Sequence, residues 1–98
     1  MVLHIDPEKR ELRELKEAAI WRRKRVVEIG CGDGRLTERL ANLGARIDAI
    51  DPEAKLIRAA RRRKPARLAA RIRYHVGKAE HLPAGNGSVD RVVFAWSL

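Results

Sequence analysis

Directly after a short β-branched run, this chain carries three glycines at alternate positions, an arrangement that serves a tight strand-to-helix turn and, in some proteins, a ligand. The run is Val26-Val27-Glu28-Ile29, and the glycines are Gly30, Gly32 and Gly34. β-Branched residues favour a buried strand, and glycines without Cβ atoms allow a tight turn and the close approach of a ligand. Because leucines with helical spacing follow, the sequence predicts strand 26–29, a glycine loop and a helix over 35–43.

The rest of the chain continues this alternation of strands and helices. Strands are predicted over 47–50, 72–76 and 92–96, a leading helix over about 7–21, and a helix that opens at Pro52 and ends at Pro65, with Leu56, Ile57 and Ala60 on its inner face. Such an alternation is typical of an open parallel sheet with helices on both faces. Because ligands bind these sheets outside the carboxyl ends of the strands, we expect the functional site just after residues 29, 50, 76 and 96.

Length and composition limit the chain to one small domain. Its 98 residues are 45% hydrophobic and 36% charged, which suits a single folded unit. We divide it into a leading helix and basic linker over 1–25 and a core over 26–98. The lone Cys31 excludes an internal disulfide and a zinc knuckle, so no metal site is expected. No secretion signal or membrane span is visible, and we expect a cytoplasmic location.

The net charge of +9 leaves two interpretations of the basic residues open. Such a charge attracts polyanions, nucleic acid among them. Most of the basic residues, however, fall on predicted helices, where a solvated charged face is ordinary. The run Arg61-Arg62-Arg63-Lys64 lies in the last turn of its helix, where positive charge interacts favourably with the helix dipole by about 0.3 to 1 kcal/mol.

The glycine loop by itself favours an anionic ligand without identifying it. The loop leads into a helix N-terminus, whose free N–H groups bind carboxylates or phosphates. A dinucleotide fingerprint would need glycine where Arg35 stands, and a phosphate-binding P-loop would need Gly-Lys-Ser/Thr, so both motifs are disfavoured. Within the loop, Cys31 either packs as a small residue or is activated by the helix end.

Asp51 is the second candidate site residue, seventeen residues beyond Gly34. At the carboxyl end of its predicted strand, its carboxylate can accept hydrogen bonds from both hydroxyls of an adenosine ribose, each worth about 1.5 to 3 kcal/mol. The alternative is that Asp51 caps the helix that Pro52 opens. The two roles are compatible.

From about residue 24 to residue 98 the sequence resembles the class I methyltransferases that use S-adenosylmethionine. Four stretches carry the resemblance: 26–34 (VVEIGCGDG), 49–52 (AIDP), 77–83 (GKAEHLP) and 88–93 (SVDRVV). The resemblance implies a Rossmann-like open sheet with strand order 3-2-1-4, the first part of a seven-stranded fold, and S-adenosylmethionine as cofactor. Methyl transfer by in-line displacement needs mainly alignment, which can supply about 7 to 11 kcal/mol, so we assign no catalytic residue.

The resemblance also implies which residues hold the cofactor. Glu28 would face the methionine amino group through water, and Asp51 would bind the ribose. The backbone N–H of Ala79 and the acidic Glu80 would recognise the adenine, whereas Lys78 stands where many members carry aspartate. The full implied set is Glu28, Gly30, Cys31, Gly32, Gly34, Asp51, Pro52, Lys78, Ala79 and Glu80.

Three strands of the family fold have no counterpart after strand 92–96, so we expect a truncated domain. That strand would then present an exposed edge, to be completed by a missing C-terminal half or by a partner chain. The methyl acceptor is not identified, and nucleic acid is one candidate that the basic charge favours slightly. Two functions stay open: the cofactor-binding part of a methyltransferase, and a non-catalytic module that binds an adenosine ligand or nucleotide.

Overall fold

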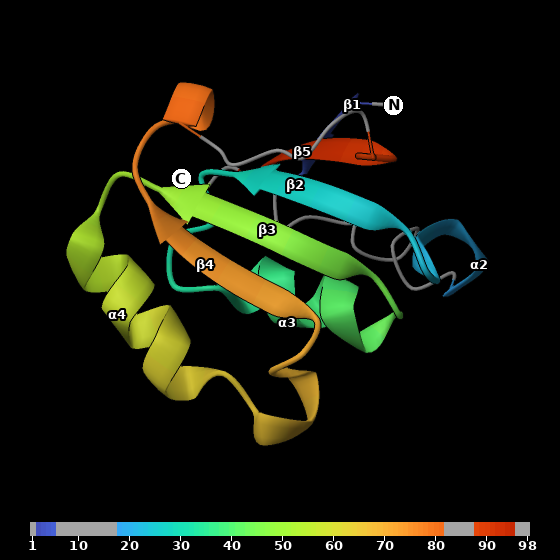
Figure 1. Cartoon of the computed structure of the whole chain (residues 1–98), viewed down its shortest axis with the longest axis horizontal. Helices are drawn as coiled ribbons and strands as arrows, with labels where there is room; N and C mark the ends of the chain where they lie inside the picture. The colour runs from blue at the N-terminus through green and yellow to red at the C-terminus, as the bar shows by residue number, and fades with distance from the viewer. Residues whose placement is uncertain (1, 6–17, 82–87, 96–98) are drawn as a thin grey trace.

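One parallel sheet with two helices against one face makes up most of the computed structural model, which describes residues 2–5, 18–81 and 88–95 (Figure 1). The strands are β1 (Val2–Ile5), β2 (Arg25–Ile29), β3 (Arg46–Asp51), β4 (Ile72–Val76) and β5 (Arg91–Ala95). The helices are α2 (Ala18–Trp21), α3 (Arg35–Asn42) and α4 (Ala54–Arg63), with 3₁₀ turns η1 (Ala66–Leu68) and η2 (Ala79–His81). No helix within these described ranges is long and apolar enough to cross a membrane.

The strands lie in the order β1-β5-β2-β3-β4, and every neighbouring pair is parallel. The predicted order 3-2-1-4 corresponds to β4-β3-β2-β5 and is confirmed. The predicted strand bounds agree with the observed ones to within one residue, except that the last residue of strand 92–96 lies outside the described residues. Local patterning was sufficient here because each strand is a short apolar run bounded by glycine, proline or charge.

The strand β1 was not predicted from the sequence. It pairs with β5, with Val2 level with Val92 and Ile5 level with Ala95. The expectation that β5 presents an open edge is therefore wrong, because the amino-terminal segment of the same chain covers that edge. A strand of only four residues offers too little periodicity to be recognised. The predicted helix 7–21 is described only over its last turn, as α2, and residues 7–17 lie outside the described residues.

The hydrophobic core lies between the sheet and the helices α3 and α4, on the face of the sheet that both helices cover (Figure 1). Side chains alternate across a sheet, so residues level with one another point to the same face. Ile47 is level with both Val26 and Ile72, and all three are buried. The core residues on strands and on the two helices are Val26, Ile47, Ala49, Ile72, Tyr74, Val93, Leu36, Leu40, Ala41, Ile57 and Ala60. The prediction of covering helices is thus confirmed for this face.

The inner face and the start of α4 differ from the prediction. Ile57 and Ala60 are buried as expected, but Leu56 is 38% exposed, because one residue turns an α-helix by about 100° and position 56 faces away from the sheet. Pro52 does not open the helix: Glu53 is the N-cap residue, and Asp51 is the last residue of β3. The interpretation of Asp51 as the helix cap is therefore wrong.

The basic run at the end of α4 has a structural function besides its interaction with the helix dipole. The guanidinium of Arg61 donates to the carbonyl oxygen of Tyr74 at 2.7 Å, and Lys64 Nζ donates to that of Ile72 at 3.2 Å. Both acceptors lie on β4, which is an edge strand of the sheet. The run therefore fastens α4 to a strand whose outer side has no neighbour among the described strands.

Candidate functional site

The glycine loop and Asp51 meet at the carboxyl edge of the sheet. In Figure 1 the arrows of β2, β3 and β4 point the same way, so their last residues lie along one edge. The N–H groups of Gly30 and Cys31 donate to the carbonyl oxygen of Ile50 at 2.9 and 3.1 Å, which bends the loop over the end of β3. The N–H of Gly32 then donates to Asp51 Oδ2 at 3.0 Å. The two features predicted independently from the sequence therefore converge on one site.

Gly34 shows why this loop needs glycine. Its φ of +88° lies in the left-handed region, which a residue with a Cβ atom occupies only at a cost of about 1 to 2 kcal/mol. A Cβ atom at this position would also collide with the hydroxyl of Tyr74 and come within 3.2 Å of Ala60 Cβ. The loop is thus packed directly onto β4 and α4, and Gly34 is the N-cap residue of α3.

Asp51 is a buried carboxylate that retains hydrogen-bonding capacity. Only 8% of the residue is exposed. Its Oδ2 accepts from the N–H of Gly32, and its Oδ1 accepts from the N–H of Glu53 at 2.9 Å. Because a carboxylate offers about four acceptor positions, about two remain for a ligand. Two backbone donors therefore hold the carboxylate in place while it can still accept from a diol.

Glu28 lies completely buried on β2, and only one of its carboxyl oxygens is satisfied. Oε1 accepts from the hydroxyl of Thr37 at 2.5 Å, whereas Oε2 has no hydrogen-bond partner among the described residues. Burial raises the pKa of Glu28 from 4.5 to about 7; the Thr37 hydrogen bond lowers this pKa and the charge of Asp51 raises it. The structure therefore holds a poorly solvated acidic group close to the second carboxylate. The contact of Glu28 with a methionine amino group stays a prediction.

Two residues near Glu28 were not predicted from the sequence to belong to the site. Thr37 lies on the inner face of α3, three residues before the buried Leu40, and Tyr74 follows Ile72 by two residues on the inner face of β4. The Tyr74 hydroxyl is buried without a hydrogen-bond partner among the described residues, and burial raises its pKa. The spacing to Leu40 and Ile72 predicts that both side chains point inward, but only the fold places them beside Glu28 and the loop.

Cys31 is a packing residue of the loop. It is 6% exposed and belongs to the hydrophobic cluster. Burial, followed by the nearby charges of Glu28 and Asp51, raises the pKa of its thiol, which disfavours the thiolate. The interpretation of Cys31 as a thiol activated by the helix end is therefore wrong, and small-residue packing explains its place in the loop.

The segment after β4 reaches the same edge of the sheet. The N–H of Gly77 donates to the backbone carbonyl of Asp51 at 3.0 Å, so Lys78 follows directly beside the second carboxylate. Lys78, Ala79 and Glu80 are all exposed, and the last two begin η2. Pro52 is exposed on the other side of Asp51. The structure therefore gathers the predicted residues along one edge, while their contacts to a ligand stay predictions.

Comparisons with known proteins agree with this geometry. A family profile described as a methyltransferase domain matches residues 26–98. An uncharacterized methyltransferase of Mycobacterium tuberculosis (strain H37Rv) is 35% identical over 72 residues, which cover 74% of this chain and 28% of that protein. The ubiquinone biosynthesis O-methyltransferase of Xanthomonas campestris pv. campestris (strain B100) is 39% identical over 69 residues, which cover 69% of this chain and 28% of that protein.

A solved structure adds a similarity in three dimensions. Phosphoethanolamine N-methyltransferase 1 of Haemonchus contortus, in complex with phosphoethanolamine and S-adenosylhomocysteine, superimposes with a TM-score of 0.68 at 29% identity, covering 87% of this chain and 20% of that chain. The chain thus spans well under a third of the length of each of these three relatives.

Proposed function

Because this chain belongs to the methyltransferase domain family, we propose that it forms the S-adenosylmethionine-binding part of an enzyme that transfers a methyl group to an acceptor. The observation that carries the proposal is the hydrogen bond from Gly32 N–H to Asp51 Oδ2, which joins the glycine loop to a buried carboxylate. A loop open to close approach and an acceptor for a diol are the two requirements of a bound nucleoside with an amino-acid tail.

The charges of the site fit the groups of this cofactor. S-Adenosylmethionine carries a sulfonium, an ammonium, a carboxylate and a ribose diol. The site offers two buried carboxylates, Glu28 and Asp51, and the N-terminus of α3, where the N–H groups of residues 35–37 have no acceptor within the helix. Oε2 of Glu28, which has no partner in the described part of the chain, supports the fit most directly, because a buried acceptor of this kind is stabilised by a cationic donor or by a bridging water.

Glu28, Asp51 and the N-terminus of α3 each have a separate role in binding this cofactor. S-Adenosylmethionine, when bound, supplies an electrophilic methyl group that departs from a sulfonium, leaving a neutral thioether. Asp51 accepts from the ribose hydroxyls, and the N-terminus of α3 binds the carboxylate of the tail. Since its pKa is about 7, Glu28 holds a proton part of the time at neutral pH, and a nearby ammonium favours release of that proton from Oε2 to solvent. These residues align the donor and do not act as nucleophiles.

The acceptor and the location of the protein are further parts of the proposal. We propose that sequence outside this segment, or a partner chain, completes the acceptor pocket. The proposal is supported by the coverage of the relatives, because the chain spans only 28% of the length of each of the two curated proteins. We also propose a cytoplasmic location, because a cofactor with three charged groups does not cross a bilayer unaided. Fractionation of cells that carry the tagged protein tests the location.

Calorimetric titration with S-adenosylhomocysteine tests the proposed cofactor site. We expect the wild-type chain to bind, and Asp51→Ala to weaken binding by about 100-fold, the equivalent of one or two hydrogen bonds to a charged group. Asp48→Asn is the matched control, since Asp48 lies on the same strand but bonds to His75 at 3.0 Å. Absence of heat from a folded wild-type chain would contradict the proposal, and so would equal losses in both variants.

A further inference from the structure

A pocket lies at the amino ends of β2, β3 and β4, at the end of the sheet away from the glycine loop. Four arginines line it: Arg25 begins β2, Arg46 begins β3, Arg71 precedes β4, and Arg73 lies within β4. Among the described residues that line this pocket, Asp48 is the only one with a carboxylate. This concentration of positive charge lies apart from the proposed cofactor site, whose buried charged side chains are the carboxylates of Glu28 and Asp51.

The strand register places these arginines side by side. Arg25 is level with Arg46 on the neighbouring strand, and adjacent strands lie about 4.8 Å apart. The N–H of Ile47 on β3 donates to the carbonyl oxygen of Arg71 at 2.7 Å. Arg71, which directly precedes β4, therefore lies beside Arg46 at the start of β3. Like charges directly opposite each other destabilise a sheet. The stability of the fold therefore does not explain why Arg25, Arg46 and Arg71 lie side by side.

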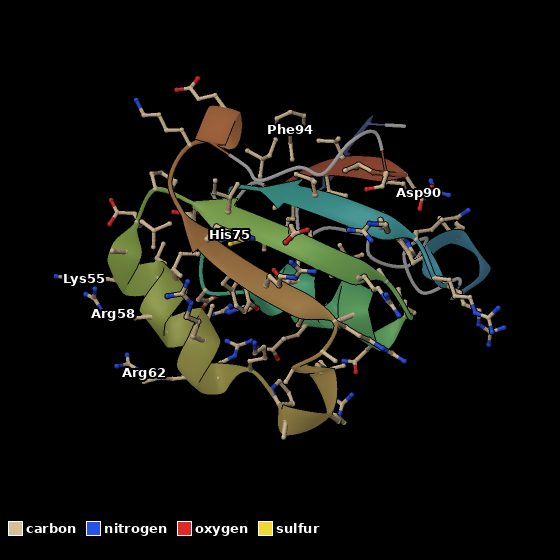
Figure 2. The ribbon with its side chains drawn as sticks, in the orientation of Figure 1. Lys55, Arg58, Arg62, His75, Asp90 and Phe94 are labelled. Carbon is tan, nitrogen blue, oxygen red and sulfur yellow. The ribbon has the colours of Figure 1, made fainter. Side chains whose placement is uncertain are left out.

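Two carboxylates of the described residues lie beside these arginines. Asp90 Oδ2 accepts from the backbone N–H of Arg25 at 2.9 Å. Asp48 is level with Arg73, but its Oδ1 lies 3.0 Å from Nε2 of His75, which Figure 2 labels on β4. Arg71 is anchored to the carbonyl oxygen of Ala41 at 3.2 Å. Within the described part of the chain, the side chains of Arg25, Arg46 and Arg73 form no salt bridge. Among the described residues, the guanidinium groups of Arg25, Arg46 and Arg73 therefore have no carboxylate bound to them and can bind an anion.

We propose that this arginine pocket binds a phosphate group. A guanidinium presents a planar fork of N–H donors that matches two oxygens of a phosphate, and arginine remains charged at all physiological pH values. A strand of five residues spans about 16 Å, so a ligand in the pocket leaves the glycine loop free. The phosphate belongs either to a small phosphate ester or to the backbone of a nucleic acid, because both present the same oxygens to the arginines.

A second basic surface provides the matched control. Lys55, Arg58 and Arg62 lie on the outer side of α4 and point away from the sheet in Figure 2. They are exposed, and, among the described residues, they line no wall of the arginine pocket. Neutralising two arginines here changes the net charge by the same amount as neutralising two in the pocket. Any difference between the two variants therefore reports the pocket and not the overall charge.

The experiment follows amide chemical shifts of the full chain during titration with inorganic phosphate at constant ionic strength. We expect the largest shifts at the amino ends of β2, β3 and β4. The double variant Arg46→Gln with Arg73→Gln should bind phosphate at least about tenfold more weakly, whereas Arg58→Gln with Arg62→Gln should bind like the wild type. Thermal unfolding of each variant checks that it is folded before titration.

A second titration with a short single-stranded RNA distinguishes the two sources of the phosphate. A pocket-dependent loss with RNA that exceeds the loss with inorganic phosphate assigns the site to a nucleic-acid backbone, and a pocket-dependent loss with inorganic phosphate alone assigns it to a small ester. Equal losses in the pocket and α4 variants would overturn the proposal, because they indicate general charge attraction. The absence of phosphate-induced shifts at the three strand ends would also overturn it.

Discussion

The two ends of the same parallel strands differ in the sign of their charge and in how firmly that charge is held. At the carboxyl end, Glu28 and Asp51 are buried, and backbone N–H groups or a hydroxyl bind three of their four oxygens. At the amino end, Arg25, Arg46 and Arg73 are exposed and unpaired among the described residues. One end is therefore fixed before a ligand arrives, whereas the other can adjust to its ligand.

The physical origin of this difference is the path of the loops. The glycine loop folds back over the carboxyl end of β3, where it donates two hydrogen bonds to Ile50 and one to Asp51. This packing excludes water and shifts the pKa of Glu28. At the amino end the arginines remain in water, where like charges repel weakly. Burial, more than charge itself, determines which end is sensitive to substitution.

The largest effect is expected for Gly34→Ala, at the buried end. We expect the free energy of unfolding to fall by about 3 to 4 kcal/mol, from left-handed backbone strain and from overlap with Tyr74 and Ala60. Urea denaturation measures this loss. Gly32→Ala is the control, because its φ is +57° but an added Cβ would meet no atom within 4 Å. Equal losses in the two variants would show that the close packing of Gly34 contributes nothing.

The pH dependence of stability should identify Glu28 as the next most sensitive group. Its pKa is raised by burial from 4.5 to about 7, so between these values the folded state keeps a proton that the unfolded chain has lost. Its stabilising contribution is present below pH 4.5 and is lost as the pH rises through 7. At about 1.4 kcal/mol per pKa unit the loss is about 3 kcal/mol.

Glu28→Gln should therefore flatten the profile of unfolding free energy between pH 4.5 and 8. Urea denaturation at several pH values measures the slope in this interval. Glu53→Gln, at an exposed position, should retain the wild-type slope. Parallel profiles for the wild type and Glu28→Gln would contradict the raised pKa of Glu28.

A smaller decrease in the free energy of unfolding is expected for Thr37→Val, which keeps the shape of the side chain and removes the donor to Glu28 Oε1. We expect the free energy of unfolding at pH 8 to fall by about 2 kcal/mol, since both oxygens of the buried Glu28 carboxylate would then lack a partner in the described part of the chain. Thr37→Ser retains the hydroxyl and should lose about 1 kcal/mol or less. Thermal unfolding at pH 8 compares the two variants, and a larger loss for serine would disprove the role of the hydrogen bond.

The smallest effect, of opposite sign, is expected at the exposed end. Arg46→Thr removes a charge that is level with Arg25 and introduces a residue that favours strands. We expect the free energy of unfolding to rise by up to about 0.5 kcal/mol at low salt. The gain should decrease in 1 M salt, where charges are screened beyond about 3 Å. A loss of stability at low salt would mean that Arg46 supports the fold, which would erase the contrast between the two ends.

Much of the site was predictable because its signals are local or follow from chain order. The spacing of Leu36, Leu40 and Leu43 and the position of Gly44 bound α3 to within one residue. Parallel topology places the ends of all strands along one edge, so the meeting of the glycine loop with Asp51 could be expected before any contact was seen. The start of α4 could not, because Pro52 suits the first turn of a helix equally well.

Short periodic patterns were sufficient to predict the order of strands and helices from β2 onward and the chemistry offered at the carboxyl edge. Three contacts follow from the packing of the fold alone: Thr37 donates to Glu28, Tyr74 lies against the glycine loop, and β1 pairs with β5. The strand register likewise places Arg25 level with Arg46. The physical reason is that register and helix packing bring together residues far apart in the chain, and a local pattern carries no record of distant partners.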